Sequence, residues 1–315
     1  MLNLIFTLFT LINTITSLEV NSSYMYKYLD YIKEYNKVFD YDNFLNFKDN
    51  IQLVQKHNSE NHSYHLEINH LSDQNIPHNT IIYHPTNGTY QGENINLTSP
   101  FSVDWREKGV ISNVKNQGRC GSCWSFSATG SIEAIHAIKT GKLLNISEQN
   151  LVDCSVDYGN KGCQGGSMDA AFKYVIDNGL CSEKSYPYTG VEGNCMDCDP
   201  IINISSYRDI IPNHEEILKL IVHQQPVSVA IQANLRSFQL YSSGVYSDPS
   251  CGTKLDHGVL IVGYGHDPFS EMDYWIVKNS WGPNWGENGY IRIQRNIDQE
   301  SGLCGIAMQP SIPIN

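Results

Sequence analysis

A cysteine at the start of a predicted helix is the residue of this sequence best suited to nucleophilic chemistry. Residues 117–124 read QGRCGSCW, and the apolar periodicity that follows predicts a helix from near Ser122 to Gly141, with Cys123 in its first turn. The N-terminus of a helix carries about half a positive charge, which favours the reactive thiolate form of a cysteine there. A buried structural cysteine can also begin a helix, so this position alone does not decide the function.

Two polar residues much later in the chain could complete a catalytic group with this cysteine. His257 introduces one apolar, strand-like stretch, and Asn279 follows another. An imidazole can exchange a proton with a thiol, and an amide can hold the imidazole ring in place. Taken singly, His257 is more simply explained as a core histidine, and Gln117 and Asn279 as turn residues.

Two Cys-x-x-Cys pairs offer a rival chemistry. Cys120, Cys123, Cys195 and Cys198 could supply four thiolates to a zinc ion, or the first two could form a redox pair. The long interval between the pairs and the apolar N-terminal leader argue against zinc, and the lack of a βαβ pattern argues against a redox pair. We therefore expect no metal and no cofactor.

The motifs around these residues resemble those of the papain family of cysteine proteases, and most of all its cathepsin L-like branch. QGRCGSCW at 117–124, LDHG at 255–258 and KNSWG at 278–282 are similar to the family's cysteine, histidine and asparagine blocks and have its spacing. Further blocks of residues 101–315 resemble the family as well: DWR at 104–106, SEQNLVDC at 147–154, GCQGG at 162–166 and GYG at 263–265.

The resemblance implies a role for each residue of the group. Cys123 attacks the scissile carbonyl as a thiolate, and His257 protonates the leaving amine as an imidazolium. Asn279 orients the imidazole ring, and Trp281 shields that hydrogen bond from water. Gln117 and the backbone N–H of Cys123 stabilise the oxyanion. The activity implied is hydrolysis of peptide bonds.

The absence of one insertion and the presence of the nucleophile indicate the type of peptidase. No insertion between Gly166 and Tyr186 is long enough to close a substrate cleft, which favours an endopeptidase over the alternative of an exopeptidase of the same fold. A second alternative is a non-catalytic homologue that only binds peptides. Such homologues typically lose the nucleophile, whereas Cys123 is present.

The resemblance also implies a pocket for the substrate residue two before the scissile bond. Met168, Ala230 and Leu255 would make its walls apolar and favour Leu, Val or Phe, and the uncharged Gln309 at its floor cannot pair with Arg as a glutamate would. Gly165 and Gly166 would let the substrate backbone lie alongside in strand-like pairing. The substrate-binding residues implied are Gly165, Gly166, Ser167, Met168, Ala230, Leu255, Gly258, Trp281 and Gln309.

The nine cysteines all follow residue 119, and an odd number leaves at least one thiol unpaired. Three bridges are implied by the resemblance: Cys120–Cys163, Cys154–Cys195 and Cys251–Cys304, with Cys123 free. Cys181 and Cys198 remain, and we predict that they form a fourth bridge. The alternative is two further unpaired thiols.

The segment before the peptidase resembles an inhibitory prosegment of the same family. Phe47, Asn50 and Asn58 fit the end of its helical ERFNIN pattern, but Asn43 and Phe39 stand where that pattern has Arg and Glu. A second block of the family is matched by Asn69, Leu71 and Asp73. The resemblance therefore predicts a zymogen whose prosegment fills the cleft until cleavage near residues 97–100.

Six of the eleven histidines lie in residues 18–98. An unperturbed histidine becomes charged near pH 6.5, so acid adds positive charge to this segment. We hypothesise that His62, His65 and His70, which surround the block at 69–73, help acid to loosen the prosegment. The alternative sensor is the carboxyl group of Asp73.

These residues must be positioned by helices early in the chain and strands later. Helical spacing of aromatic and apolar residues predicts two helices, over about 24–35 and 44–54, and another from Ser167 to Asn178. Strand-like patterns occur at 227–231, 259–262, 274–277 and 290–293. Residues 76–100 have turn formers and little periodicity, which predicts an extended connector.

We therefore expect an α+β protein with a papain-like two-lobed fold: a helical left lobe over about 108–207 and an antiparallel, β-barrel-like right lobe over about 208–309 with an N-terminal strand. The domains expected are a signal peptide at 1–17, a helical inhibitory propeptide similar to the I29 type at 18–98, and the mature peptidase at 99–315.

Composition excludes some partners. The chain has 315 residues, of which 41 % are hydrophobic, and a net charge of −12, so no surplus of Lys or Arg exists to bind nucleic acid. The partners expected are peptide and protein substrates, the chain's own propeptide and cystatin-like inhibitors, with the enzyme itself a monomer.

The first residues predict entry into the secretory pathway. Residues 4–15 form an uncharged, largely apolar run that is too short to span a bilayer and typical of a signal-peptide core. No later segment is apolar enough to cross a membrane. We expect a destination in the lysosome or outside the cell and glycosylation at some of six sequons, Asn21, Asn61, Asn87, Asn96, Asn145 and Asn203.

Overall fold

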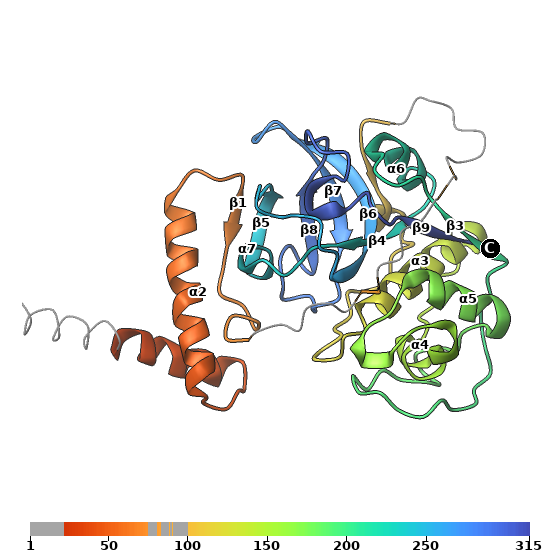
Figure 1. The fold of residues 1–315 in the computed structure, drawn as a ribbon, viewed down its shortest axis with the longest axis horizontal. Coiled ribbons are helices and arrows are strands. Elements are labelled where there is room, and N and C mark those ends of the chain that lie inside the picture. The colour runs from red at the N-terminus through yellow and green to blue at the C-terminus, as the bar shows by residue number, and fades with distance from the viewer. Residues whose placement is uncertain (1–21, 75–80, 83–87, 89, 91–99) are drawn as a thin grey trace, which may run out of the picture. The chain divides into compact units, whose positions relative to one another are not determined.

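The structure is a computed structural model that describes residues 22–74, 81, 82, 88, 90 and 100–315 (Figure 1). The chain divides into two compact units, Met1–Asn61 with Ile68–Asn75, and His62–Glu67 with Ile76–Asn315. The expected signal peptide, most of the expected connector and the sequons at Asn21, Asn87 and Asn96 lie outside the described residues. No helix of the described part is long and apolar enough to cross a membrane.

The first unit contains the two helices that the spacing of its apolar residues predicts. One covers residues 22–34, and the other is α2, Tyr41–Ser59, whose N-cap Asp40 accepts a hydrogen bond from the backbone N–H of Asn43. One face of each helix contributes to a small aromatic core that includes Tyr28, Phe44 and Phe47.

Asp73 fastens the turn at 69–74 to these helices. Its carboxylate is buried, accepts a hydrogen bond from the hydroxyl of Tyr31 at 3.0 Å, and is paired with the ammonium of Lys37. Lys37 also donates to the backbone carbonyl of His70. The cation beside Asp73 therefore comes from residue 37, whereas residue 43, where the family's pattern has arginine, is Asn.

Five helices and four short 3-10 helices occur in the described part of the second unit. The α-helices are α3 Cys123–Thr140, α4 Glu148–Cys154, α5 Met168–Asn178, α6 Glu215–Val222 and α7 Arg236–Gln239, and the 3-10 helices are Trp105–Lys108, Val156–Tyr158, Gly162–Gln164 and Leu303–Gly305. The predicted start and end of α3 and α5 are confirmed. Gly141 ends α3 in the left-handed conformation that glycine adopts without strain. Helices α3, α4 and α5 lie together on one side of this unit (Figure 1).

Nine strands form the sheet of the second unit. They are β1 Tyr64–Leu66, β2 Val103–Asp104, β3 Ser206–Asp209, β4 Val227–Ile231, β5 Tyr241–Tyr246, β6 His257–Asp267, β7 Met272–Lys278, β8 Tyr290–Gln294 and β9 Ser311–Ile314. Their order is β1-β5-β8-β7-β6-β4-β9-β3, with β2 paired to β6. All four predicted strands are present.

Two details of the expected right lobe need correction. The sheet is an open path and does not close into a barrel, and β5 pairs with β8 in parallel, so the lobe is not purely antiparallel. The mixed α+β class is confirmed. Strand β6 connects the two halves of the unit, because the Ser127 hydroxyl of α3 donates to the carbonyl of Val259 in β6 at 2.6 Å.

All four predicted disulfides are present, and Cys123 is the free cysteine among the described residues. The bridges are Cys120–Cys163, Cys154–Cys195, Cys181–Cys198 and Cys251–Cys304. With eight thiols used in this way, the cysteines no longer offer a four-thiolate zinc site or a Cys120–Cys123 redox pair.

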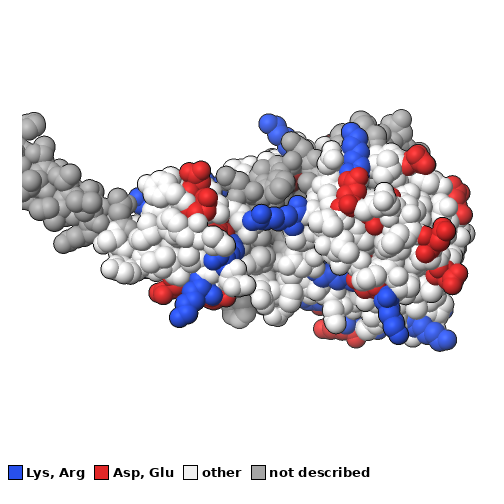
Figure 2. All heavy atoms as spheres, turned by 90° about the horizontal axis from the view of Figure 1, so that it is seen from below, with Lys and Arg blue, Asp and Glu red and all other residues white. Residues whose placement is uncertain are grey.

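Charge is spread thinly over the described surface. On the face shown in Figure 2, acidic and basic side chains are interspersed, and the described basic residues form no continuous patch there.

Candidate active site

Cys123 is the first residue of α3 and is completely buried. Its thiol lies at the positive end of the helix, as the sequence predicts, and the backbone N–H of Gly258 points to its sulfur at 3.2 Å. Gly258 follows His257 at the start of β6, where Ile231 of β4 is the partner of His257. The fold thus brings the predicted nucleophile and the predicted proton donor to one place.

Asn279 holds the ring of His257 in a defined orientation. Its Oδ1 atom lies 2.7 Å from Nε2 of His257 and 2.8 Å from the backbone nitrogen of Ser280. A backbone N–H can only donate, so the atom that faces it must be the amide oxygen, and Nε2 must be the donor to that oxygen. This tautomer leaves Nδ1 as the nitrogen able to exchange a proton with the thiol.

Trp281 covers the histidine from one side. The centres of the two rings are 4.7 Å apart, the planes are inclined by 32°, and both residues are buried. Water is therefore kept from the bond between His257 and Asn279, which strengthens it. The indole is itself held edge-on by Phe238 and Trp285.

Gln117 is held at both ends of its side-chain amide. Its Oε1 accepts from the Ser280 hydroxyl at 2.7 Å, and its Nε2 donates to the carbonyl of Cys120 at 2.9 Å. An amide nitrogen carries two N–H bonds, so one remains for an oxyanion formed at Cys123. Ser280, which the sequence did not single out, therefore supports Gln117 with its hydroxyl and Asn279 with its backbone.

Comparison with known families decides how this arrangement should be read. The family model described as papain family cysteine protease matches residues 99–314, and that described as cathepsin propeptide inhibitor domain (I29) matches residues 28–75. The chain belongs to the papain family of cysteine proteases. Its N-terminal region is a propeptide, so the chain has the form of a zymogen.

Relatives and solved structures support the assignment over most of the chain. Cysteine proteinase RD21A of Arabidopsis thaliana is 47 % identical over 281 residues, which cover 85 % of this chain and 60 % of that protein. The KDEL-tailed cysteine endopeptidase CEP2 of the same plant is 45 % identical over a region that covers 85 % of this chain and 78 % of that protein. The proform of the ragweed pollen allergen Amb a 11 superposes with a TM-score of 0.84 at 38 % identity, covering 93 % of this chain and 95 % of that chain. The recombinant stem bromelain precursor superposes with a TM-score of 0.85 at 38 % identity, covering 93 % of this chain and 99 % of that chain. The chain thus spans only about 60 % of the length of the RD21-type relatives.

One of the two glycines predicted to line the substrate cleft of this papain-family chain, Gly166, is paired with another segment of the chain. The carbonyl of Gly166 accepts a hydrogen bond from the backbone N–H of Ile82 at 2.9 Å, and Ile81 forms a parallel bridge with Gly166. Gly166 has to be glycine, because a Cβ atom there would lie 2.6 Å from the ring of Trp124. Gly165 adopts a positive φ of 116°, which also favours glycine.

Three residues predicted to wall the substrate pocket lie in or against one hydrophobic core cluster. Met168 and Ala230 are fully buried in one core cluster with Cys123, and Leu255 packs against it. Gln309 is 1 % exposed, and neither of its amide atoms has a hydrogen-bond partner among the described residues. Of the other predicted members, Ser167 is buried as the N-cap of α5, and Gly258 faces Cys123 and Ile81.

Asp169 is a buried carboxyl group beside Gln309 that the sequence analysis missed. Burial, followed by the charge of Asp209, raises the pKa of Asp169 to about 6. Its only sequence signal is an aspartate in the first turn of a helix, which ordinarily indicates a favourable interaction with the helix end and nothing more.

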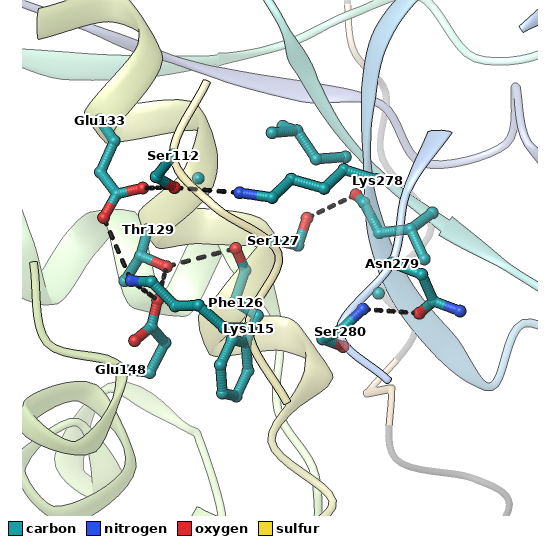
Figure 3. A pocket seen from close by; sticks show the side chains of 14 residues that line it. Ser112, Lys115, Phe126, Ser127, Thr129, Glu133, Glu148, Lys278, Asn279 and Ser280 are labelled. Carbon is teal, nitrogen blue, oxygen red and sulfur yellow. Dashed lines mark hydrogen bonds and ion pairs between the residues drawn. The ribbon is translucent and has the colours of Figure 1, made fainter. Parts of the chain in front are cut away.

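A buried group of charges lies behind Asn279 and Ser280 and was also missed (Figure 3). Lys115 is bonded to both Glu133 and Glu148, and Lys278 donates to Ser112, which in turn donates to Glu133. Burial holds the pKa of Glu148 above its usual range and lowers that of Lys278 to about 8. These charges link α3 and α4 to Lys278, the last residue of β7, which directly precedes Asn279.

Proposed function

We propose that the mature chain is a cysteine endopeptidase that hydrolyses peptide bonds with Cys123 and His257. The observation that carries this proposal is the geometry around His257: its ring is fixed by Asn279 at 2.7 Å, and the residue after it contacts the sulfur of a buried, free Cys123 at the start of α3.

The reaction follows from these positions. The thiolate of Cys123 adds to the scissile carbonyl carbon, and the resulting oxyanion is met by the Gln117 amide and the backbone N–H of Cys123. The C–N bond then breaks as His257 gives its proton to the leaving nitrogen, which leaves a thioester. A water molecule deprotonated by His257 attacks the thioester and releases the acid product with the free thiol.

Specificity is proposed to lie in the pocket of Met168, Ala230 and Leu255, with Gln309 at its floor. The apolar walls favour Leu, Val or Phe two residues before the scissile bond. The cleft residues Gly165, Gly166, Ser167, Gly258 and Trp281 are assigned to the substrate in the same proposal. The description of the relative CEP2 as a cysteine endopeptidase supports internal cleavage.

Activation is proposed to require acid and removal of residues 18–98 from the peptidase at 99–315. The pairing of Ile81 and Ile82 with Gly166 supports inhibition by occupation of the cleft. Two of the three histidines suggested as acid sensors, His62 and His65, are exposed, whereas the alternative, Asp73, is buried.

The cellular setting is proposed to be the secretory pathway, leading to the lysosome or the outside of the cell. A relative described as KDEL-tailed supports this route, and so does the set of four disulfides. Asn61, Asn145 and Asn203 are exposed, which supports them as glycosylation sites. We propose a monomer that cystatin-like inhibitors can bind.

A peptide library tests the activity and the pocket together. The full chain is expressed and acidified, and its cleavage of the library is profiled. We expect cleavage of peptides that have Leu, Val or Phe two residues before the scissile bond, and no cleavage by Cys123→Ala. Gln309→Glu should raise the ratio of kcat/KM for Arg to that for Leu by about tenfold, because a carboxylate can accept two guanidinium N–H bonds. Absence of cleavage by the wild type contradicts the activity, and an unchanged ratio contradicts the place of Gln309.

A further inference from the structure

The hydroxyl group of Tyr188 connects two residues beside the oxyanion position, and the mechanism above does not use it. It lies 2.9 Å from the carbonyl oxygen of Gln117 and 2.7 Å from Oγ of Ser122. A carbonyl can only accept, so Tyr188 donates its single proton to Gln117, and Ser122 must be the donor in the other bond. The result is a series of two hydrogen bonds in which Ser122 donates to Tyr188 and Tyr188 donates to Gln117.

Ser122 is diverted from its ordinary local role to make this series of hydrogen bonds. It is the N-cap of α3, the helix that begins with Cys123, and it is fully buried. A serine at an N-cap usually accepts a hydrogen bond from a backbone N–H in the first turn, but the Ser122 side chain makes no such bond. Its contact with Tyr188 replaces a cap that would stabilise α3.

We propose that Tyr188 is a positioning residue that fixes the distance between the two oxyanion donors. One donor is the side chain of Gln117, whose backbone carbonyl Tyr188 holds directly. The other is the N–H of Cys123, which belongs to the peptide bond that begins at Ser122. The inference rests on the proposed function, because it requires an oxyanion between these two donors.

The tyrosine is itself held firmly enough to act in this way. Its ring packs edge-on against Phe126 of α3, with 4.9 Å between ring centres, and its backbone N–H donates to Glu183 at 2.9 Å. Burial is the main reason that the pKa of Tyr188 is raised to about 12, so the hydroxyl remains a donor from acidic to mildly basic pH. Gln117 is also tied to Ser280 on its other side, so Tyr188 completes its restraint.

The substitution Tyr188→Phe tests the inference, with variants matured by immobilised wild-type enzyme that is then removed. Complete loss of an oxyanion donor costs about 100-fold or more in kcat, so loosened spacing should lower kcat by about tenfold with little change in KM. The affinity for a peptide aldehyde, whose adduct with Cys123 places an oxygen between the donors, should fall by a similar factor. Alkylation of Cys123 by iodoacetamide forms no oxyanion and should keep its rate and pH profile.

Tyr186→Phe is the matched control, because it removes a hydroxyl from the same Tyr-Pro-Tyr block. The Tyr186 hydroxyl donates to Asp153 at 2.9 Å, away from Gln117 and Ser122. This variant should lose thermal stability but keep the wild-type affinity for the aldehyde. Ser122→Ala removes the hydrogen bond at the other end of this series and should weaken aldehyde binding as well. Combined with Tyr188→Phe, it should weaken binding little further.

The outcomes separate this inference from the proposed function. Wild-type aldehyde affinity in Tyr188→Phe overturns the inference and leaves the protease activity standing. Equal losses in aldehyde binding and in iodoacetamide alkylation also overturn it, because Tyr188 would then support the fold in general. A wild type that neither hydrolyses peptides nor is alkylated at Cys123 overturns the proposed function instead.

Discussion

The functional site depends on a few individual residues. One buried residue beside Gln309, Asp169, should also influence how folding stability depends on pH. Because burial raises its pKa to about 6, the folded protein binds more protons than the unfolded chain between about pH 4 and pH 6. The contribution of Asp169 to folding stability is therefore largest below this range and falls as pH rises through it. Asp169→Asn removes this contribution, which amounts to at most about 3 kcal/mol, and should make the dependence shallower, while Glu148 and Asp256, whose pKa values burial also raises, keep part of it.

Urea unfolding of the mature protein in an inactive Cys123→Ser background measures this effect. The free energy of unfolding is compared at several pH values for Asp169 and Asp169→Asn, with Asp157→Asn, an exposed aspartate, as the control. A pH dependence as steep in Asp169→Asn as in the native protein would contradict this role of Asp169.

The proposed catalytic residues could be found in the sequence because each lies within a short motif of distinctive composition. Cys123, His257 and Asn279 are brought together as those motifs imply, and Trp281 covers the histidine as expected. Ser280 and Tyr188 could not be found in this way. Their roles arise from contacts between segments far apart in the chain, and serines and tyrosines are too common for their type to signal such contacts.

Helices and strands were predictable where one face is apolar. The periodicity of the residues within α2, α3 and α5 and of β4, β6, β7 and β8 identified them. The parallel pairing of β5 with β8 was not predictable, since a strand's own pattern does not record the direction of its neighbour. Short strands such as β2, with two residues, are too brief to show a pattern.

One element of the propeptide depends on an ion pair that the family pattern would not have located. Lys37 pairs with the buried Asp73, and Lys37→Gln would leave this carboxylate without its cation. Loss of one partner of a buried ion pair destabilises by about 3 kcal/mol or more, so the propeptide unit should unfold in milder acid. Self-processing of the full chain should then begin at a higher pH than in the wild type.

The control for this change is Lys33→Gln, which removes an exposed lysine from the preceding helix and an equal charge. Processing is followed by gel mobility after a pH jump, with the midpoint recorded for each variant. If Lys37→Gln and Lys33→Gln have the same midpoint, the pair with Asp73 does not hold the zymogen together.

The molecule as a whole combines an inhibitor domain and a peptidase domain in one chain. We propose that the peptidase works because Cys123 and His257 act together. Helix α3 and Asn279 prepare this pair in the folded peptidase unit. If His257 stabilises the thiolate, Cys123 should react as a nucleophile well below pH 8.5, the range of an ordinary thiol. Loss of the imidazole should return it to that range.

The rate of iodoacetamide alkylation of Cys123 as a function of pH measures this most directly, with intact mass confirming one adduct per mature chain. We expect rapid alkylation that persists into acid for the wild type. For His257→Ala we expect a pH profile shifted upward toward the range of an ordinary thiol. Asn279→Ala should lie between them, because it loosens the ring without removing it. A His257→Ala profile that coincides with the wild type would contradict the pairing on which the proposed mechanism depends.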